Sequence, residues 1–132
     1  MINLKGNKML ELTRAEDQVM QVLWRKKKAF VKDLLSEFPD PKPAYNTIST
    51  IIRILEKKGF VSHKAYGKTH EYFPLISKPD YTKSFMKGFM QDYFSGSFKR
   101  MVSFFAKEKE ISLEDIESIK EMLEKESKTN KE

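Results

Sequence analysis

An amphipathic helix, a stop signal and a hairpin follow one another between residues 45 and 74, and this order constrains the fold more than any other feature of the chain. The predicted helix has an aliphatic face formed by Ile48, Ile51, Ile52 and Leu55. Gly59 follows and supplies the left-handed residue that commonly ends a helix. Alternating apolar and polar residues then flank Tyr66, Gly67 and Lys68, which predicts two strands joined by a basic turn.

The polar residues of this segment suit contact with DNA. A helix followed by a basic hairpin is the arrangement by which a winged helix-turn-helix addresses DNA, with polar residues early in the helix facing base edges. The predicted helix places three polar residues, Asn46, Thr47 and Thr50, on one face, at positions i, i+1 and i+4. Asparagine can form two hydrogen bonds with adenine, and the methyl group of threonine can pack on the methyl group of thymine. The predicted base contacts are Asn46, Thr47, Thr50 and Arg53. The predicted backbone contacts are Lys42, Tyr45, Ser49, Lys64 and Lys68.

The positive charge is confined to the half of the chain that holds this segment. Residues 1–75 carry 14 Lys and Arg against 8 Asp and Glu, which accounts for the whole net charge of +6, whereas residues 76–132 carry 11 of each. A basic patch on one region is what binding to phosphates requires. The alternative interpretation of the charge, and of the polar helix face, is a surface that is merely solvated.

The flanking sequence predicts a mainly α (α+β) fold with distinct parts. Residues 1–10 are expected to form a flexible N-terminal arm. Residues 11–76 are expected to form the winged-helix domain, whose first helix starts at a capping box of Thr13 and Glu16. A shorter helix and a proline-rich connector precede the polar helix.

The C-terminal part, residues 77–125, predicts a helical dimerisation arm. Aromatic residues recur every four positions from Phe85 and continue to Phe105, which predicts one long helix with a wide apolar stripe, and Ser112 opens another amphipathic helix. The predicted dimer interface comprises Phe85, Phe89, Tyr93, Met101, Phe105, Ile116, Ile119 and Leu123. Packing against the N-terminal half is one alternative, and a membrane-surface helix is another that the zero net charge disfavours. Residues 126–132 are expected to be a disordered tail.

Residue types needed for catalysis are scarce. The chain has no cysteine, which excludes disulfides and thiolate chemistry and fits a cytoplasmic protein. Its two histidines, His63 and His70, fall on neighbouring predicted strands and could face each other, but two histidines without a third ligand rarely bind a metal. No phosphate-binding loop, zinc-protease motif or apolar stretch long enough for a membrane span occurs. We therefore expect no enzyme, no metal, no cofactor and no membrane insertion.

The residues that carry these signals resemble the penicillinase-repressor family of BlaI- and MecI-type regulators, which includes copper-responsive relatives. The resemblance covers roughly residues 10–123. The matching stretches are Leu12–Glu16, Val19–Trp24, Tyr45–Thr50, Arg53–Gly59 and Tyr66–Pro74, whose order is specific in combination although each stretch alone is a weak signal. It implies an N-terminal winged helix, a C-terminal dimerisation arm and repression of genes for antibiotic resistance or a related stress response. It implies two partners: double-stranded DNA that carries a palindromic operator, and a second copy of this chain.

The resemblance also implies a route of induction, in which a membrane sensor with a metalloprotease domain leads to cleavage in the C-terminal arm. The corresponding region here is Ser103, Phe104 and Phe105, where better-known members carry an Asn-Phe bond. The copper-sensing branch carries C-terminal cysteines, so the absence of cysteine excludes copper thiolate sensing. Asn46 stands where some members have lysine, so their operator sequence does not transfer.

Two other functions remain to be distinguished from sequence-specific repression. A winged-helix adaptor that docks another protein without reading DNA would use the apolar C-terminal helix, and its binding to random duplex would be absent or insensitive to salt. An RNA-binding protein would need aromatic faces for base stacking, and Tyr66 and Tyr72 are few for that role.

Overall fold

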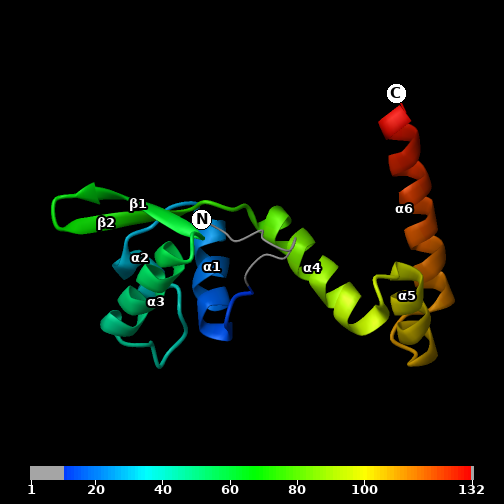
Figure 1. The fold of residues 1–132 in the computed structure, drawn as a ribbon, viewed down its shortest axis with the longest axis horizontal. Helices are drawn as coiled ribbons and strands as arrows, with labels where there is room; N and C mark the ends of the chain where they lie inside the picture. The colour runs from blue at the N-terminus through cyan, green and yellow to red at the C-terminus, as the bar shows by residue number, and fades with distance from the viewer. Residues whose placement is uncertain (1–10, 132) are drawn as a thin grey trace. The chain divides into compact units, whose positions relative to one another are not determined.

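The structure is a computed structural model that describes residues 11–131. Within these residues it contains six helices and one antiparallel hairpin (Figure 1). In chain order the elements are α1 (Arg14–Lys26), α2 (Val31–Ser36), α3 (Tyr45–Lys57), β1 (Val61–Tyr66), β2 (Thr69–Pro74), α4 (Lys78–Phe94), α5 (Phe98–Lys107) and α6 (Leu113–Lys131). This mainly helical order with one hairpin confirms the predicted fold class. The chain divides into two compact units, one that ends at Met86 and one that begins at Lys87.

The core of the N-terminal unit is made by α1, α2, α3 and the hairpin. Side chains with no accessible surface include Val19, Met20, Leu23, Leu34, Ile52, Leu55 and Phe60. Burial of one such aliphatic or aromatic side chain contributes about 1.5–3 kcal/mol relative to leaving it exposed. The helical spacing of these residues in the sequence therefore corresponds to one shared core that holds α3 in place.

The predicted capping box at the start of α1 is present and has a further partner. The hydroxyl of Thr13 accepts from the backbone N–H of Glu16 at 3.2 Å, and the Glu16 carboxylate accepts from the backbone N–H of Thr13 at 3.0 Å. Lys58, which follows α3, donates to both carboxylate oxygens of Glu16 at 2.8 Å. This contact joins the start of α1 to the end of α3, 42 residues away in sequence.

The hairpin is fixed by its register and by an extra backbone pair. β1 and β2 pair from Val61 with Pro74 to Tyr66 with Thr69, and Gly67 in the connecting turn has φ 64°, a conformation that favours glycine. Tyr72 also exchanges two backbone hydrogen bonds with Ala29, of 2.8 and 2.9 Å. The hairpin is therefore anchored to the segment between α1 and α2.

The N-terminal unit extends beyond the predicted boundary at residue 76. The indole nitrogen of Trp24 donates to the carbonyl oxygen of Ile76 at 2.9 Å, and the Tyr81 hydroxyl accepts from the backbone N–H of Leu12 at 3.0 Å. Tyr81 is only 8% exposed. The first turns of α4 thus belong to the N-terminal unit, because an aromatic side chain on α4 completes its core.

The structure corrects two predictions for the C-terminal part. The single long helix expected from Phe85 to Phe105 is two helices, because Ser95 and Gly96 adopt positive φ values of 52° and 75° between α4 and α5. The expected disordered tail, residues 126–132, is helical through residue 131, because α6 continues to Lys131. A reciprocal Ser112–Asp115 capping box begins α6. The predicted flexible arm, residues 1–10, lies outside the described residues.

None of the helices in residues 11–131 combines the length and the apolar character that crossing a lipid bilayer requires.

Candidate nucleic-acid interface

α3 presents one continuous polar face to solvent. Asn46, Thr50, Arg53 and Lys57 follow one another at intervals of four, three and four residues, so they share one side of the helix, and all four are exposed. The opposite side is buried through Ile48, Ile52 and Leu55. The core therefore fixes which side chains α3 offers to a ligand.

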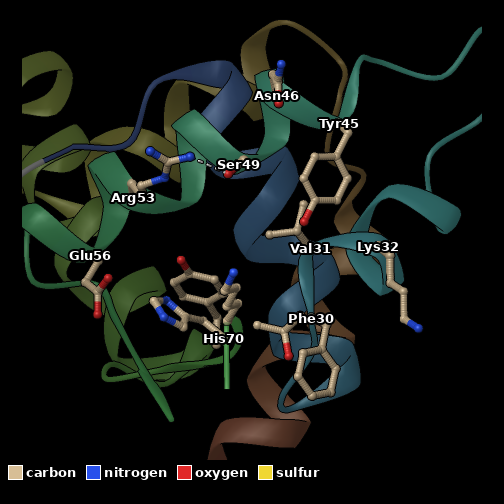
Figure 2. A pocket seen from close by; sticks show the side chains of 12 residues that line it. Phe30, Val31, Lys32, Tyr45, Asn46, Ser49, Arg53, Glu56 and His70 are labelled. Atoms are coloured by element: carbon tan, nitrogen blue, oxygen red, sulfur yellow. Dashed lines mark hydrogen bonds between the residues drawn. The ribbon is translucent and has the colours of Figure 1, made fainter. Parts of the chain in front are cut away.

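A groove lies between α3, the start of α2 and the hairpin, and we call it the helix–wing groove (Figure 2). It has a volume of about 680 Å³. The residues that line it are Phe30, Val31, Lys32, Tyr45, Asn46, Ser49, Arg53, Glu56, Lys68, Thr69, His70 and Tyr72. Five of the predicted DNA-contacting residues, from α3 and from the turn of the hairpin, thus line one groove: Tyr45, Asn46, Ser49, Arg53 and Lys68.

Arg53 is held within this groove by a neighbour on the same helix. Its guanidinium group donates to the Ser49 hydroxyl at 2.8 Å, as Figure 2 shows. Ser49 is only 8% exposed, whereas Arg53 is exposed. Ser49 was predicted to contact the DNA backbone, but its buried hydroxyl is already occupied by Arg53.

Thr47 lies at the edge of the polar face and outside the helix–wing groove. Successive residues of an α-helix point about 100° apart. Thr47 consequently lines a separate shallow cleft with Phe38, Ile51 and prolines of the connector, while Asn46 lines the helix–wing groove. Thr47 is exposed, at the edge of the polar face.

Lys42 also lies outside the groove. Its ammonium group donates to the backbone carbonyl oxygens of Phe38 at 2.6 Å and Ser36 at 3.3 Å. These carbonyl groups lie at the C-terminal end of α2, where a positive charge is favourable. Lys42 therefore stabilises the end of α2 in this structure.

One basic side chain of the hairpin lies over an aromatic ring. The Lys64 ammonium lies 5.3 Å from the centre of the Tyr66 ring, within the range of a cation–π contact. The Tyr66 ring in turn contacts the Phe30 ring, with 5.8 Å between centres. Two aromatic rings therefore link the tip of the hairpin to the start of α2.

The two histidines lie together, on the side of the hairpin that faces α3. Their rings stack at 4.0 Å with 6° between planes, and His63 Nδ1 lies 2.5 Å from the Glu56 carboxylate of α3. Beside them Tyr72 is 4% exposed, and burial, with a further contribution from Glu56, raises the pKa of its phenol. Residues 11–131 contain no group of three or more histidine and carboxylate side chains that could hold a metal ion.

Comparison with known proteins identifies the family of this chain. The family model described as penicillinase repressor matches residues 12–125. The chain belongs to the penicillinase repressor family. The methicillin resistance regulatory protein MecI of Staphylococcus aureus (strain N315) is 32% identical over 120 residues, 90% of this chain and 98% of that protein. The penicillinase repressor of Bacillus licheniformis is 27% identical over 126 residues, 95% of this chain and 98% of that protein.

One solved structure is also similar to part of the chain. The DNA-binding domain of the repressor BlaI, a solution structure, is 29% identical with a TM-score of 0.47, over 54% of this chain and 88% of that domain. Membership of the penicillinase repressor family confirms the resemblance and the predicted class, a DNA-binding repressor.

The family match extends through the C-terminal unit, where the predicted dimer residues lie. The rings of Phe89 and Tyr93 contact each other on α4, and Phe94 contacts Phe104 and Phe105 of α5. Between α5 and α6 is an open apolar cleft of about 450 Å³, lined mainly by Phe98, Val102, Ile116, Ile119 and Leu123. Phe85 falls instead in the N-terminal unit, and the predicted cleavage region, Ser103, Phe104 and Phe105, lies within α5.

Three residues at the candidate interface of this penicillinase-repressor family member were not among those predicted. Lys57 stands four residues after Arg53, so extending the same helical spacing by one turn would have found it. Phe30 and Glu56 act through contacts with the hairpin. No periodicity within one element reports such contacts, because they depend on tertiary packing.

Proposed function

We propose that this chain is a homodimeric repressor of transcription that recognises a palindromic operator through α3 and the hairpin. The observation that carries the proposal is the helix–wing groove, in which Asn46 and Arg53 of α3 lie on the same surface as Lys68 of the basic turn. Side chains that can read bases and side chains that can bind phosphates therefore lie on one surface. Such a surface lets a helix enter the major groove of DNA while the hairpin contacts the flanking backbone.

The residues of α3 divide between reading and support. Asn46, Thr50 and Arg53 are the central base contacts, and Thr47 meets DNA from the edge of the face, beside the proline connector. Ser49 serves by orienting the Arg53 guanidinium, which it contacts at 2.8 Å. Arginine held in one orientation can bond two acceptors of guanine, so its support affects specificity.

The backbone contacts come from side chains around the groove. Tyr45 and Lys68 line the groove, and Lys64 lies over the exposed ring of Tyr66 at the hairpin. Lys42 contributes its positive charge from the end of α2, where its ammonium also binds two carbonyl groups. Phosphate contacts of this kind add affinity for any sequence and make binding depend on salt.

The second copy of the chain is proposed to bind through the C-terminal unit. The apolar side chains proposed for the interface in this unit are Phe89, Tyr93, Met101, Phe105, Ile116, Ile119 and Leu123, to which Phe85 adds from the N-terminal unit. A two-fold symmetric dimer would present two copies of α3, which explains the palindromic operator.

Control of the repressor is proposed to follow the relatives. They are named for methicillin resistance and for penicillinase, so we propose that the operator lies before genes for antibiotic resistance or a related stress response. A membrane sensor protease pathway would lead to cleavage at Ser103–Phe105. Because these residues are within α5, cleavage requires local opening of that helix.

Selection from a randomised duplex pool, followed by footprinting on DNA upstream of the coding region, tests the proposed reading of DNA. We expect a two-fold symmetric site.

The double change Asn46→Ala and Thr47→Ala should remove the preference for that site and keep nonspecific affinity, whereas Lys68→Ala should weaken binding to all sequences and reduce the salt dependence. Equal loss of both kinds of binding in the Asn46 and Thr47 variant would contradict the assignment of base contacts. Absence of any duplex binding would instead favour the adaptor function.

A further inference from the structure

Glu56, His63 and His70 form a compact cluster that joins the hairpin to α3. Glu56 lies on α3, and its carboxylate is 2.5 Å from Nδ1 of His63 on β1. The His63 ring stacks on the ring of His70, which lies on β2. The side chains of His63 and Glu56 are 30% and 29% exposed, so water reaches the cluster. We call these three residues the histidine clamp.

The clamp faces a surface that is otherwise basic. Glu56 and His70 line the helix–wing groove, and Glu56 supplies the only carboxylate among the 12 lining residues. The charged and titratable groups around it are Arg53 and Tyr45 from α3, Lys32 from α2, and Lys68 and Tyr72 from the hairpin. The rings of both histidines also contact the Tyr72 ring, at 5.6 and 6.1 Å. A polyanion in this groove would therefore lie against His70.

The clamp contains two stacked imidazole rings but only one carboxylate. Two positively charged rings stacked at 4.0 Å repel each other, and Glu56 contacts only one of them. A phosphate group near His70 would supply the second negative charge. Histidine is the side chain whose charge ordinarily changes between about pH 5 and 8, and the chain contains only these two.

We propose that the histidine clamp positions the hairpin against α3 for DNA binding and takes up a proton when DNA enters the groove. The inference rests on the proposed DNA-binding function and adds a dependence of that function on pH. Because the DNA-bound state holds the extra proton, affinity rises as the pH falls. Glu56 acts as a positioning residue: its carboxylate lines the groove but would repel a phosphate, so its contribution comes from its contact with His63 on the hairpin.

The first test measures the full chain with two probes, a duplex recovered from a randomised pool and a duplex of scrambled sequence. Uptake of one proton per chain tightens binding by up to about tenfold per chain for each unit of pH. Between about pH 7.5 and 6 we expect at least roughly a threefold tightening per chain on the selected duplex. Calorimetry in two buffers of different ionisation enthalpy counts the protons directly, and this needs no variant.

The second test compares a variant of His70 with a variant of a matched basic residue on the same hairpin. His70→Gln should abolish proton uptake and flatten the pH profile. Lys64→Gln should weaken binding at every pH and leave the slope of the profile unchanged, because lysine stays charged over this range. The imidazole proton signals of His63 and His70 in nuclear magnetic resonance spectra, recorded with and without DNA, report which ring gains the proton.

The third test separates positioning from simple charge. Glu56→Gln removes a negative charge from the groove, so electrostatics alone would tighten binding to both duplexes. If Glu56 positions the hairpin, the variant should instead lose discrimination, with the affinity ratio between selected and scrambled duplex falling by about threefold or more, as loss of a charged hydrogen bond implies. A tighter complex with unchanged discrimination would overturn the positioning role.

The outcomes distinguish this inference from the proposed function. Specific DNA binding with no proton uptake and a flat pH profile would overturn the clamp and leave the repressor function intact. Absence of binding to either duplex at every pH would overturn both. The inference would also be overturned if the His70→Gln variant still took up a proton on DNA binding and the proton were bound by a group outside the clamp.

Discussion

The two units of the molecule bury apolar side chains to very different extents. In the N-terminal unit, seven large side chains, six from three helices and Phe60 just before the hairpin, have no accessible surface, and Tyr81 of α4 completes the same core. Between residues 87 and 128 no residue is buried, and Tyr93 and Leu123 are 72% and 61% exposed. An apolar surface of this extent is typical of a chain that binds a partner. The first unit is stabilised by its own core, whereas the second leaves its apolar side chains exposed to a binding partner.

The strongest test of this contrast places charges on the open apolar surface. Tyr93→Glu combined with Leu123→Glu should prevent the proposed pairing of two chains, because a carboxylate cannot be buried there without a partner. Loss of two-site binding is expected to weaken operator affinity by about a hundredfold or more. Sedimentation equilibrium measures the pairing, and titration of a palindromic duplex measures the affinity.

The same variant has an internal control in the other unit. Because neither residue belongs to the N-terminal unit, its thermal unfolding and its binding to a single half-site should stay as they are. A variant that remains a monomer yet binds the palindrome with full affinity would break the link between the C-terminal unit and the symmetric operator.

A cavity in the core should produce the next largest effect, and only in the N-terminal unit. Ile52 has no accessible surface, so Ile52→Ala should lower the free energy of unfolding by about 2–5 kcal/mol. The matched change Ile54→Ala, on the same helix at 41% exposure, should cost about 0.5 kcal/mol or less. Denaturant titration gives both values, and similar losses would mean that α3 packs on another face.

Local signals in the sequence predicted the N-terminal unit better than the C-terminal one. The capping box of Thr13 and Glu16, and the order of helix and hairpin, are determined by neighbouring residues, so the sequence alone revealed them. The break between α4 and α5 was missed because the aromatic spacing continues across Ser95 and Gly96, while the backbone there turns to positive φ.

Within the candidate site, the face of α3 was predictable but the state of individual side chains was not. Helical spacing placed Asn46, Thr50 and Arg53 correctly on one side. The burial of Ser49, the engagement of Lys42 with the end of α2, and the contact of Glu56 with His63 depend on which elements pack together. Single-element patterns do not carry that information.

The ion pair between Glu16 and Lys58 should give the N-terminal unit a stability that depends on pH. Burial acts to raise the pKa of Glu16, but hydrogen bonds from Lys58 and the Thr13 backbone outweigh it and hold the pKa below its ordinary value of 4.5. The contribution is therefore present above about pH 4.5 and is lost as the pH falls through the lower folded-state value. Glu16→Gln should lower stability near neutral pH by about 1–3 kcal/mol and flatten this acid-side loss.

An exposed ion pair provides the control for that prediction. Arg25 and Glu37 lie 3.0 Å apart, but both side chains are substantially exposed, at 59% and 34%. Glu37→Gln should therefore leave the unfolding transition almost unchanged, because water and salt screen such pairs. Thermal unfolding from acidic to neutral pH compares the two variants, and equal effects would show that the Glu16 contact is no stronger than a surface pair.

The smallest expected effect decides how Ser49 contributes to recognition. If Ser49 acts through Arg53, Ser49→Ala should reduce affinity for the selected site by about fivefold, the value of one hydrogen bond of about 1 kcal/mol. Arg53→Ala should cost more, and the double variant should then bind no more weakly than Arg53→Ala alone, since the serine would have nothing left to orient. Additive losses would instead mean that Ser49, although 8% exposed in the free chain, turns to contact a phosphate when DNA binds. Affinities of the four proteins for the selected and scrambled duplexes complete this cycle, and a loss confined to the selected duplex would identify orientation of Arg53 as the cause.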